Sequence, residues 1–239
     1  MLMKKSLVQT VQEIISGKTE EESLALLAEK FPFNIVFSTS FGVEDQVITD
    51  MIFSNNIPIK VFTIDTGRFF PETYLVWNHT REVYRKKIEV YFPNTETLEK
   101  MLTEKGPNSF YESVENRMEC CYIRKVEPLS RALKGNKIWI TGIRKDQSDT
   151  RQRMEQVEWD EKYQVVKFHP LFYWSLEQAW NYIHKKNIPY NSLHDKGFPS
   201  IGCQPCTRAI KEGEDIRAGR WWWEHNQKKE CGLHTRNKI

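Results

Sequence analysis

Four of the five cysteines in this sequence form two pairs. Cys120 and Cys121 are adjacent, and Cys203 and Cys206 are separated by two residues. Neighbouring Cα atoms lie about 3.8 Å apart, which is too close for ordinary disulfide geometry. A C-x-x-C turn aims both of its sulfurs at one metal. The four thiolates therefore predict a metal site, which is either an iron–sulfur cluster or tetrahedral zinc.

A cluster is favoured over zinc because its thiolates bind separate irons, so adjacent ligands need not share one tetrahedron. Lys125 stands one helical turn after Cys121 and would place a positive charge beside a net-negative cluster. The remaining alternative is that these four residues are ordinary core cysteines.

The fifth cysteine, Cys231, has no partner left among the five. Lys228, Lys229 and His234 flank it, and nearby cations favour the thiolate and hence its nucleophilicity. Gly232 gives the backbone freedom to swing the thiol in and out of a site. The competing interpretation is an incidental cysteine near a chain end.

The secondary-structure elements that must position these groups are short apolar strands that alternate with helices. We expect strands over 34–37, 59–64, 88–92 and 137–141. We expect helices over 23–31, opened by a capping-box pattern at 19–22, and over 43–53 and 71–86. This alternation predicts parallel βαβ units, and thus an α/β fold with a mostly parallel sheet flanked by helices. Ligands of such sheets bind beyond the carboxyl ends of the strands.

The later part of the chain has a different character. A hairpin is expected over 159–168, a last helix over 175–186, and an irregular stretch over 187–202. Such a long loop is seldom kept in a compact fold without a use. We expect one α/β domain that binds nucleotide and metal over 1–206, and a C-terminal segment with the remaining cysteine over 207–239.

Polar, glycine-bearing segments follow three of the predicted strands, at Ser38–Gly42, Asp65–Gly67 and Thr141–Arg144. Hydroxyls and backbone N–H groups at a helix start can bind a phosphate. Arginine forks match phosphate and sulfate oxygens, and candidates occur in the segment from Arg144 to Arg151 and at Arg217 and Arg220, whose spacing of three predicts a shared helical face. Ordinary turns and solvated charges are the alternatives.

The formal net charge of the 239 residues is +3. This is far from the basic excess of a duplex-binding module, so we expect no nucleic-acid partner. Polar residues interrupt the N-terminal apolar positions, and no apolar run approaches the roughly 20 residues that span a bilayer. We expect a cytoplasmic protein, in which cysteines serve metal binding or catalysis more often than disulfides.

Taken together and in order, the motifs between about residues 34 and 234 resemble the cluster-bearing assimilatory adenylyl-sulfate reductases. The resemblance is carried by Cys120-Cys121 with Lys125, Cys203-x-x-Cys206, Arg217-x-x-Arg220-Trp-Trp-Trp-Glu, and Lys-Glu-Cys-Gly-Leu-His around Cys231. The loops Ser-Thr-Ser-Phe-Gly-Val-Glu-Asp from Ser38, Ile-Asp-Thr-Gly from Ile64 and Thr-Gly-Ile-Arg from Thr141 match as well.

The resemblance implies an adenine-nucleotide α-hydrolase-like fold, one [4Fe–4S] cluster per chain held by Cys120, Cys121, Cys203 and Cys206, and thioredoxin as reductant. Cys231 would attack the sulfur of adenylyl sulfate, and the products would be AMP and sulfite. The implied phosphosulfate contacts are Arg144, Arg151, Arg217, Arg220 and His234, with Lys125 between cluster and substrate. The implied nucleotide frame is Ser38, Thr39, Ser40, Gly42, Asp65, Thr66 and Gly67.

Three other functions stay open at this point. The nearest is reduction of 3′-phosphoadenylyl sulfate, alone or beside adenylyl sulfate, although family members for that substrate usually lack the cysteine cluster. An ATP pyrophosphatase-type ligase or thiolase would need a Ser-Gly-Gly-x-Asp-Ser loop, which is absent. A non-enzymatic redox sensor on nucleic acid lacks a supporting basic patch. The sequence also leaves a homo-oligomer open.

Overall fold

The computed structural model describes residues 2–224, with the side chains of residues 2, 3, 5, 149 and 150 left aside. Its strands are β1 (Ile35–Ser38), β2 (Lys60–Ile64), β3 (Glu89–Tyr91), β4 (Ile138–Ile140), β5 (Val157–Asp160) and β6 (Val165–Phe168). Its α-helices are α1 (Leu2–Ile15), α2 (Glu20–Lys30), α3 (Val43–Ser54), α4 (Pro71–Tyr84), α5 (Thr95–Lys105), α6 (Val114–Cys121), α7 (Glu127–Leu133), α8 (Asp149–Gln152) and α9 (Leu176–Lys186).

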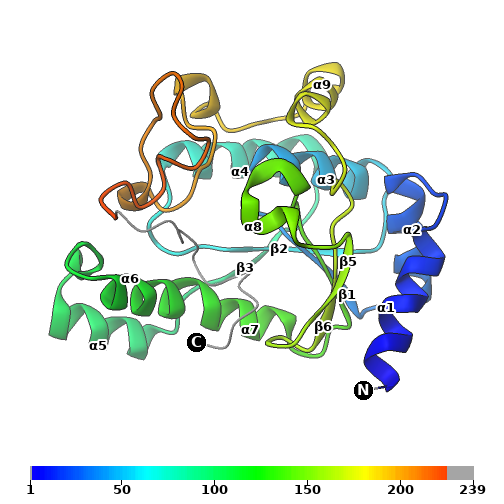
Figure 1. Ribbon diagram of the computed structural model, residues 1–239, viewed down its shortest axis with the longest axis horizontal. Helices are drawn as coiled ribbons and strands as arrows, with labels where there is room; N and C mark the ends of the chain where they lie inside the picture. The colour runs from blue at the N-terminus through cyan, green and yellow to red at the C-terminus, as the bar shows by residue number, and fades with distance from the viewer. Residues whose placement is uncertain (1, 225–239) are drawn as a thin grey trace. The chain divides into compact units, whose positions relative to one another are not determined.

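The strands form one sheet in the order β3-β2-β1-β4-β6-β5 (Figure 1). β1 is parallel to β2 and β4, with Phe37 opposite Val61 on one side and Ile140 on the other. β6 is parallel to β4 and antiparallel to β5. The predicted α/β fold and the hairpin near its edge are both confirmed.

Local sequence signals explain where the helices begin. Thr19 caps α2 and exchanges hydrogen bonds with Glu22, as the capping-box pattern predicts. Ser175 and Gln178 do the same at the start of α9. Pro71 is the first residue of α4, where its missing N–H costs no helical hydrogen bond. These helix starts are therefore specified locally.

The chain divides into two compact units. The first comprises 1–63, 72–89 and 135–191, and the second 64–71, 90–134 and 192–239. The boundary expected at residue 206 lies inside the second unit, and a single domain over 1–206 stays a prediction. No helix among residues 2–224 has the length and apolarity to cross a membrane.

The first unit has a large apolar core built on its strands and on α3. Nearly every residue of α3 is buried, and the helix packs against α9, which lies beside it in Figure 1. Phe37, Ile48 and Ile140 belong to this core and are fully buried. Because β1 and β4 are buried runs, the polar residues that follow them mark the ends of the strands.

The second unit contains two local features that sequence periodicity does not show. Residues 122–126 form a π-helix between α6 and α7. The residues from Ile216 to Gly219 form turns, and Arg220 forms an isolated β-bridge with Thr207. The prediction that Arg217 and Arg220 share a helical face is therefore wrong, because backbone pairing with the segment after Cys206 replaces the helix.

Candidate functional site

The four paired cysteines lie around one pocket in the second unit. Cys120 and Cys121 end α6, whose first turn is capped by the Ser113 side chain. Cys203 and Cys206 belong to a tight turn in which the Cys206 N–H donates to the Cys203 carbonyl over 2.9 Å. The pocket is lined by Arg68, Phe110, Arg117, Cys120, Cys121, Arg124, Lys125, Cys203, Pro205, Cys206 and Trp221.

The segment after β2 closes against the cysteine turn. The Thr66 hydroxyl lies 3.3 Å from the Cys203 sulfur, and the Gln204 N–H donates to the Arg68 carbonyl over 2.8 Å. Gly67 has a φ of +68°, and its N–H donates to the Asp65 carboxylate. This glycine allows the tight turn that brings Thr66 to the sulfur. Two motifs more than 130 residues apart therefore form one site.

Cations surround these sulfurs and set their acidity. Burial raises the pKa of the Cys203 thiol, but Lys125, the Thr66 hydroxyl, Arg220 and Arg124 together outweigh it, and the net pKa is lowered. Burial raises the pKa of Cys206 to about 12, helped by its cysteine neighbours. Thiolates that line one pocket repel one another, and this repulsion raises the pKa of Cys206 further.

Two buried N–H groups in the wall of the pocket have no hydrogen-bond acceptor within the described residues. Arg124 donates from Nη1 to the Thr66 carbonyl over 2.6 Å, yet its Nε, like Nε1 of Trp221, is buried with no hydrogen-bond partner in the described part of the chain. Within residues 2–224, no three His, Cys, Asp or Glu side chains gather as around one metal ion. Four thiolates, cations and orphaned N–H groups around one pocket are the chemistry that suits an iron–sulfur cluster.

Trp221 is held in an unusual conformation beside the cysteines. Its φ is +43°, which is rare for a bulky residue and costs conformational energy. The guanidinium groups of Arg117 and Arg220 lie 4.9 Å from its ring centroid, and Arg117 forms a buried ion pair with Glu224. Arg220 fits because Gly202 is a glycine: a Cβ there would lie 2.3 Å from the guanidinium.

The hydroxyl groups that follow β1 form hydrogen bonds with other groups of the first unit. The Ser38 hydroxyl accepts from Trp139 Nε1 over 2.8 Å. The Thr39 hydroxyl accepts from the Phe41 N–H over 3.1 Å. Ser40 donates from both its N–H and its hydroxyl to Asp45, over 2.6 and 2.7 Å. The loop is thus a rigid turn, with Gly42 as the N-cap of α3.

Asp45 is buried where this loop meets the end of β4. Burial raises the pKa of its carboxyl to about 6, although the Ser40 hydrogen bonds and Arg151 oppose the shift. Gly142 follows β4 closely, and a Cβ there would lie 2.3 Å from Asp45 Oδ1. The conformation of the β4 loop therefore requires glycine at position 142.

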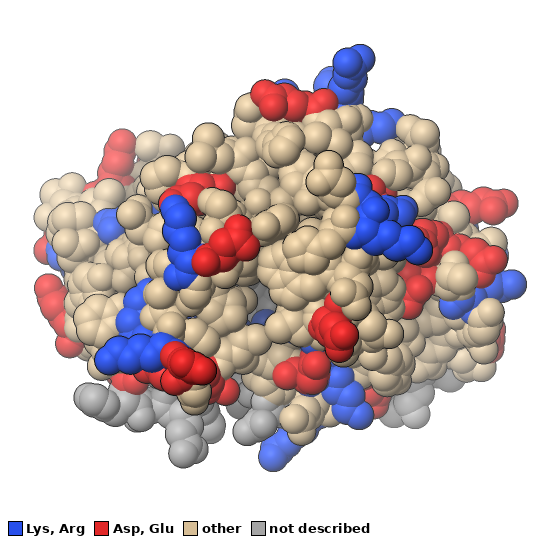
Figure 2. Space-filling view, turned by 90° about the horizontal axis from the view of Figure 1, so that it is seen from above, with Lys and Arg blue, Asp and Glu red and all other residues tan. Residues whose placement is uncertain are grey.

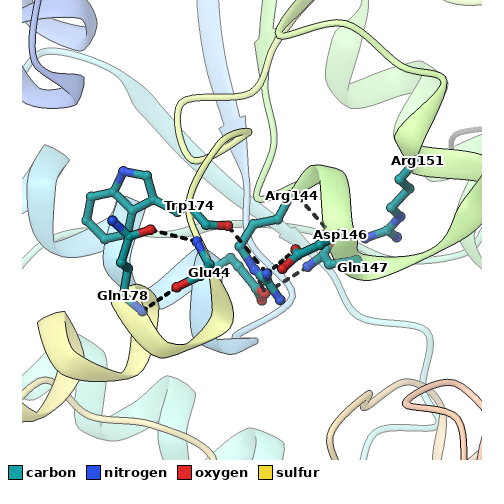
Figure 3. A network of polar contacts seen from close by, with 8 residues as sticks. Glu44, Arg144, Asp146, Gln147, Arg151, Trp174 and Gln178 are labelled. Atoms are coloured by element: carbon teal, nitrogen blue, oxygen red, sulfur yellow. Dashed lines mark hydrogen bonds and ion pairs between the residues drawn. The ribbon is translucent and has the colours of Figure 1, made fainter.

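Arg144 takes part in a network of polar contacts (Figure 3). Its Nε lies 2.7 Å from Glu44 Oε1, and its Nη1 pairs with Asp146. Gln147 donates to the same Glu44 oxygen over 2.8 Å and accepts from Arg151. The sequence predicted Arg144 and Arg151 as anion ligands, but it contained no signal that Glu44 would form an ion pair with Arg144.

Sequence reasoning also missed a buried histidine next to the β4 loop. His169 follows β6, and its Nδ1 lies 2.7 Å from the Thr141 hydroxyl. Burial, together with the charges of Lys167 and Arg151, lowers its pKa well below 6.5. A neutral imidazole therefore fixes the first residue of the loop. A single histidine in an apolar segment offers no pattern from which this pairing could be found.

Of the remaining predicted site residues, two lie in the described part of the chain and two do not. Lys125 lines the cysteine pocket. Arg217 lies in the turn before Arg220, where its N–H donates to Asp215 over 2.8 Å. Cys231 and His234 lie outside the described residues, so their roles stay predictions.

The fold and these sites define an α/β protein with a mostly parallel sheet and with a cysteine pocket in its second unit. A family model for the phosphoadenosine phosphosulfate reductase domain matches residues 34–209. The adenosine 5′-phosphosulfate reductase of Allochromatium vinosum is 47% identical over 203 residues, which cover 85% of this chain and 79% of that protein. That of Rhizobium meliloti is 49% identical over 200 residues, 84% and 76% of the two chains. This chain belongs to the phosphoadenosine phosphosulfate reductase family.

Solved structures agree with this membership. The crystal structure of the phosphoadenylyl-sulfate reductase from Candida auris, a phosphate complex, has 30% sequence identity and a TM-score of 0.72, over 85% of this chain and 96% of that one. Yeast FAD synthetase, at 16% identity and a TM-score of 0.55, shares the fold alone. The named reductase relatives are oxidoreductases that act on sulfur, which places this chain in that class of enzymes.

Proposed function

We propose that this enzyme reduces adenylyl sulfate to sulfite and AMP, with a dithiol protein of the thioredoxin type as reductant in the cytoplasm, as part of assimilatory sulfate reduction. The observation that carries the proposal is the single pocket formed by four cysteines and lined by cations. The relatives named adenosine 5′-phosphosulfate reductase support the choice of substrate.

The first step is a displacement at sulfur by the Cys231 thiolate. A bond forms between Cys231 Sγ and the sulfuryl sulfur, and the bond from that sulfur to the phosphate oxygen breaks, so AMP leaves. The anionic oxygens on the sulfur repel a thiolate, and cations must offset that repulsion. Arg217, Arg220 and Lys125 of the second unit are the groups we assign to this task, together with His234.

The second step returns the enzyme to its thiol. A thiolate of the reductant attacks Cys231 Sγ, sulfite departs with the bonding electron pair, and a mixed disulfide remains. The second thiol of the reductant resolves that disulfide and restores the Cys231 thiol. Two electrons and the balancing protons come from the dithiol, so the chemistry needs no further redox group.

Cys120, Cys121, Cys203 and Cys206 are proposed to hold one [4Fe–4S] cluster. Thiolates of a cluster bind different irons, so they need only surround a common pocket. The cluster would supply an electrostatic and architectural contribution, and the chain's own groups provide the rest. The Thr66 hydroxyl lies next to the Cys203 sulfur, and Arg124 donates to the Thr66 carbonyl and so helps to hold this residue in place.

Adenine nucleotide is proposed to bind at the carboxyl ends of the parallel strands. The first unit contributes the loop with Ser38, Thr39, Ser40 and Gly42, and Arg144 and Arg151 follow β4. Asp65, Thr66 and Gly67 extend from β2. Any anion that meets Arg144 must compete with Glu44 and Asp146 for the guanidinium.

The proposal is tested by incubating the reduced protein with adenylyl sulfate in the absence of any reductant, followed by intact-protein and peptide mass spectrometry. We expect one sulfonate on Cys231 and one equivalent of released AMP. The Cys231→Ser variant should bind AMP with unchanged affinity and gain no sulfonate. An adduct that survives in this variant would remove Cys231 from its assigned role.

A further inference from the structure

Residues 221–224, which precede the segment with Cys231, are held by buried contacts in the second unit. Arg117 of α6 forms an ion pair with Glu224, and the two side chains are only 4% and 7% exposed. The Glu224 N–H also donates to the Trp221 carbonyl over 2.9 Å. The ion pair therefore ties residue 224 to the helix that ends in two of the pocket cysteines.

Contacts of the preceding residues fix the same segment. Trp221 is 1% exposed, and its N–H donates to the Cys206 carbonyl over 3.1 Å. The guanidinium of Arg117 lies 4.9 Å from the centroid of its ring. The ring centroid of Trp223 lies 4.4 Å from that of Tyr111. The positive φ of Trp221 persists because its surroundings determine it, and strain of this kind is concentrated at functional sites.

The ion pair between Arg117 and Glu224 fixes a position more effectively than it adds stability. Both charges lose their hydration on burial, so a buried pair gives little net stability over apolar side chains of similar size. The best-attested use of such a pair is to specify one arrangement of the chain. Any other place for Glu224 would leave a buried guanidinium uncompensated, and the segment is therefore held at α6.

The held segment is the start of the tether that carries Cys231. This cysteine lies seven positions after Glu224, and seven residues span at most about 25 Å when fully extended. Release of residue 224 from α6 would lengthen the effective tether. The effective concentration of a tethered group falls as its tether lengthens, and a reacting group that is already held in place has less freedom to lose before it reacts.

We infer that Arg117 and Glu224 are positioning residues, whose buried ion pair fixes the start of the tether and raises the effective concentration of the Cys231 thiolate at the substrate sulfur. The inference rests on the proposed function, because it takes Cys231 to be the nucleophile. Neither side chain needs to touch the substrate in this role. The displacement at sulfur is unchanged, and the pair affects only its rate.

The rate of Cys231 sulfonation in a single turnover tests the inference on the full chain. Anaerobically purified protein is mixed with saturating adenylyl sulfate and no reductant, and the sulfonated fraction is followed by mass spectrometry. Glu224→Gln removes the charge and keeps the size of the side chain. It should slow sulfonation by about tenfold or more, because a small displacement of a reacting group costs up to about 100-fold. Iron content and AMP affinity should stay at the wild-type values.

Alkylation of Cys231 by iodoacetamide separates position from nucleophilicity. This small neutral reagent needs no fixed tether, so Glu224→Gln should react with it at the wild-type rate. Glu224→Asp keeps a carboxylate for Arg117 and should be sulfonated at a rate between those of wild type and Glu224→Gln. The matched control is Glu214→Gln, which breaks a more exposed ion pair with Arg208 in the same unit and should leave both rates unchanged.

The possible failures are distinguishable. Sulfonation of Glu224→Gln at the wild-type rate, or an equal slowing of sulfonation and alkylation, would overturn the positioning role and leave the reductase proposal standing. If Glu224→Gln loses iron or AMP binding, Glu224→Asp decides: slower sulfonation at unchanged AMP affinity supports the role, and an unchanged rate overturns it. A wild type that gains no sulfonate would overturn the proposed function, and this inference with it.

Discussion

Replacing Gly142 by alanine should destabilise the first unit, because this position meets a buried carboxylate. A Cβ at Gly142 would lie 2.3 Å from Asp45 Oδ1, 3.1 Å from Glu44 Cβ and 3.2 Å from the Asp45 backbone nitrogen. The Asp45 carboxylate is held by the Ser40 hydrogen bonds, and the other two atoms are fixed by the first turn of α3, so none of the three is the free end of a flexible side chain. The loop or the carboxylate has to move.

The size of the effect follows from what must be displaced. An extra carbon forced into a packed site costs about 1–3 kcal/mol, and each lost hydrogen bond to a charged group costs about 1.5–3 kcal/mol. Asp45 accepts two such bonds from Ser40. With partial relaxation of the loop we expect a loss of about 3 kcal/mol. That is a large part of the roughly 5–15 kcal/mol that stabilises a typical domain.

Urea unfolding followed by circular dichroism measures this loss, and Gly42→Ala is its matched control. A Cβ at Gly42 would lie 3.7 Å from the Ser40 hydroxyl, which is an ordinary contact. Its φ of −72° suits alanine, so we expect a cost below about 1 kcal/mol. Equal stabilities of the Gly142 variant and the wild type, or equal losses in the two variants, would refute the reasoning.

Two further predictions concern charge and metal. Burial raises the pKa of Asp45 from 3.8 to about 6, so the folded chain binds this proton more tightly than the unfolded chain. The stability that this group contributes falls by about 3 kcal/mol in total as the pH rises from below 3.8 to above 6, with about 2 kcal/mol of the loss between pH 4 and 6. Asp45→Asn should flatten that part of the stability curve in urea titrations, and an unchanged slope would contradict the shift. The anaerobically purified protein should be brown with about four irons per chain, and Cys203→Ser should lose iron and visible absorbance together. Stoichiometric zinc without iron would defeat the cluster assignment.

Charge on the molecular surface agrees with a small ligand more readily than with a polyanion. On the face shown in Figure 2, acidic and basic side chains are interspersed and no broad basic patch is visible. The net charge of the chain is +3. Positive charge is instead concentrated locally, where Arg68, Arg124 and Lys125 line the cysteine pocket. Local cations suit a compact anion such as a sulfated nucleotide.

The helices and strands were largely predictable because their signals are local. A capping box needs only Thr19 and Glu22, and a buried parallel strand needs only a short apolar run such as 35–38. The helical face expected for Arg217 and Arg220 failed for the opposite reason. The Arg220–Thr207 bridge that replaces it joins two segments of the chain, and spacing within one segment carries no information on such a partner.

The grouping of the four cysteines was also predictable from the sequence, because two closely spaced pairs indicate a shared site, and the structure places all four around one pocket. The residues that surround the cysteines could not be predicted from the sequence. Thr66 reaches Cys203 from 137 positions away, and Trp221 adopts its positive φ beside the same cysteines. Arg117 pairs with Glu224 across 107 positions. These contacts depend on where the chain returns in space.

By itself, the sequence determined the α/β class and the reductase family, and it predicted that four cysteines share one site, since each is encoded in residue type and short-range spacing. Only the tertiary structure decided which charges are free. Arg144 reads as an anion ligand in the sequence, and the fold pairs it with Glu44 from 100 positions away. The availability of a charge depends on its burial and on its nearest countercharge, and both are properties of the folded chain.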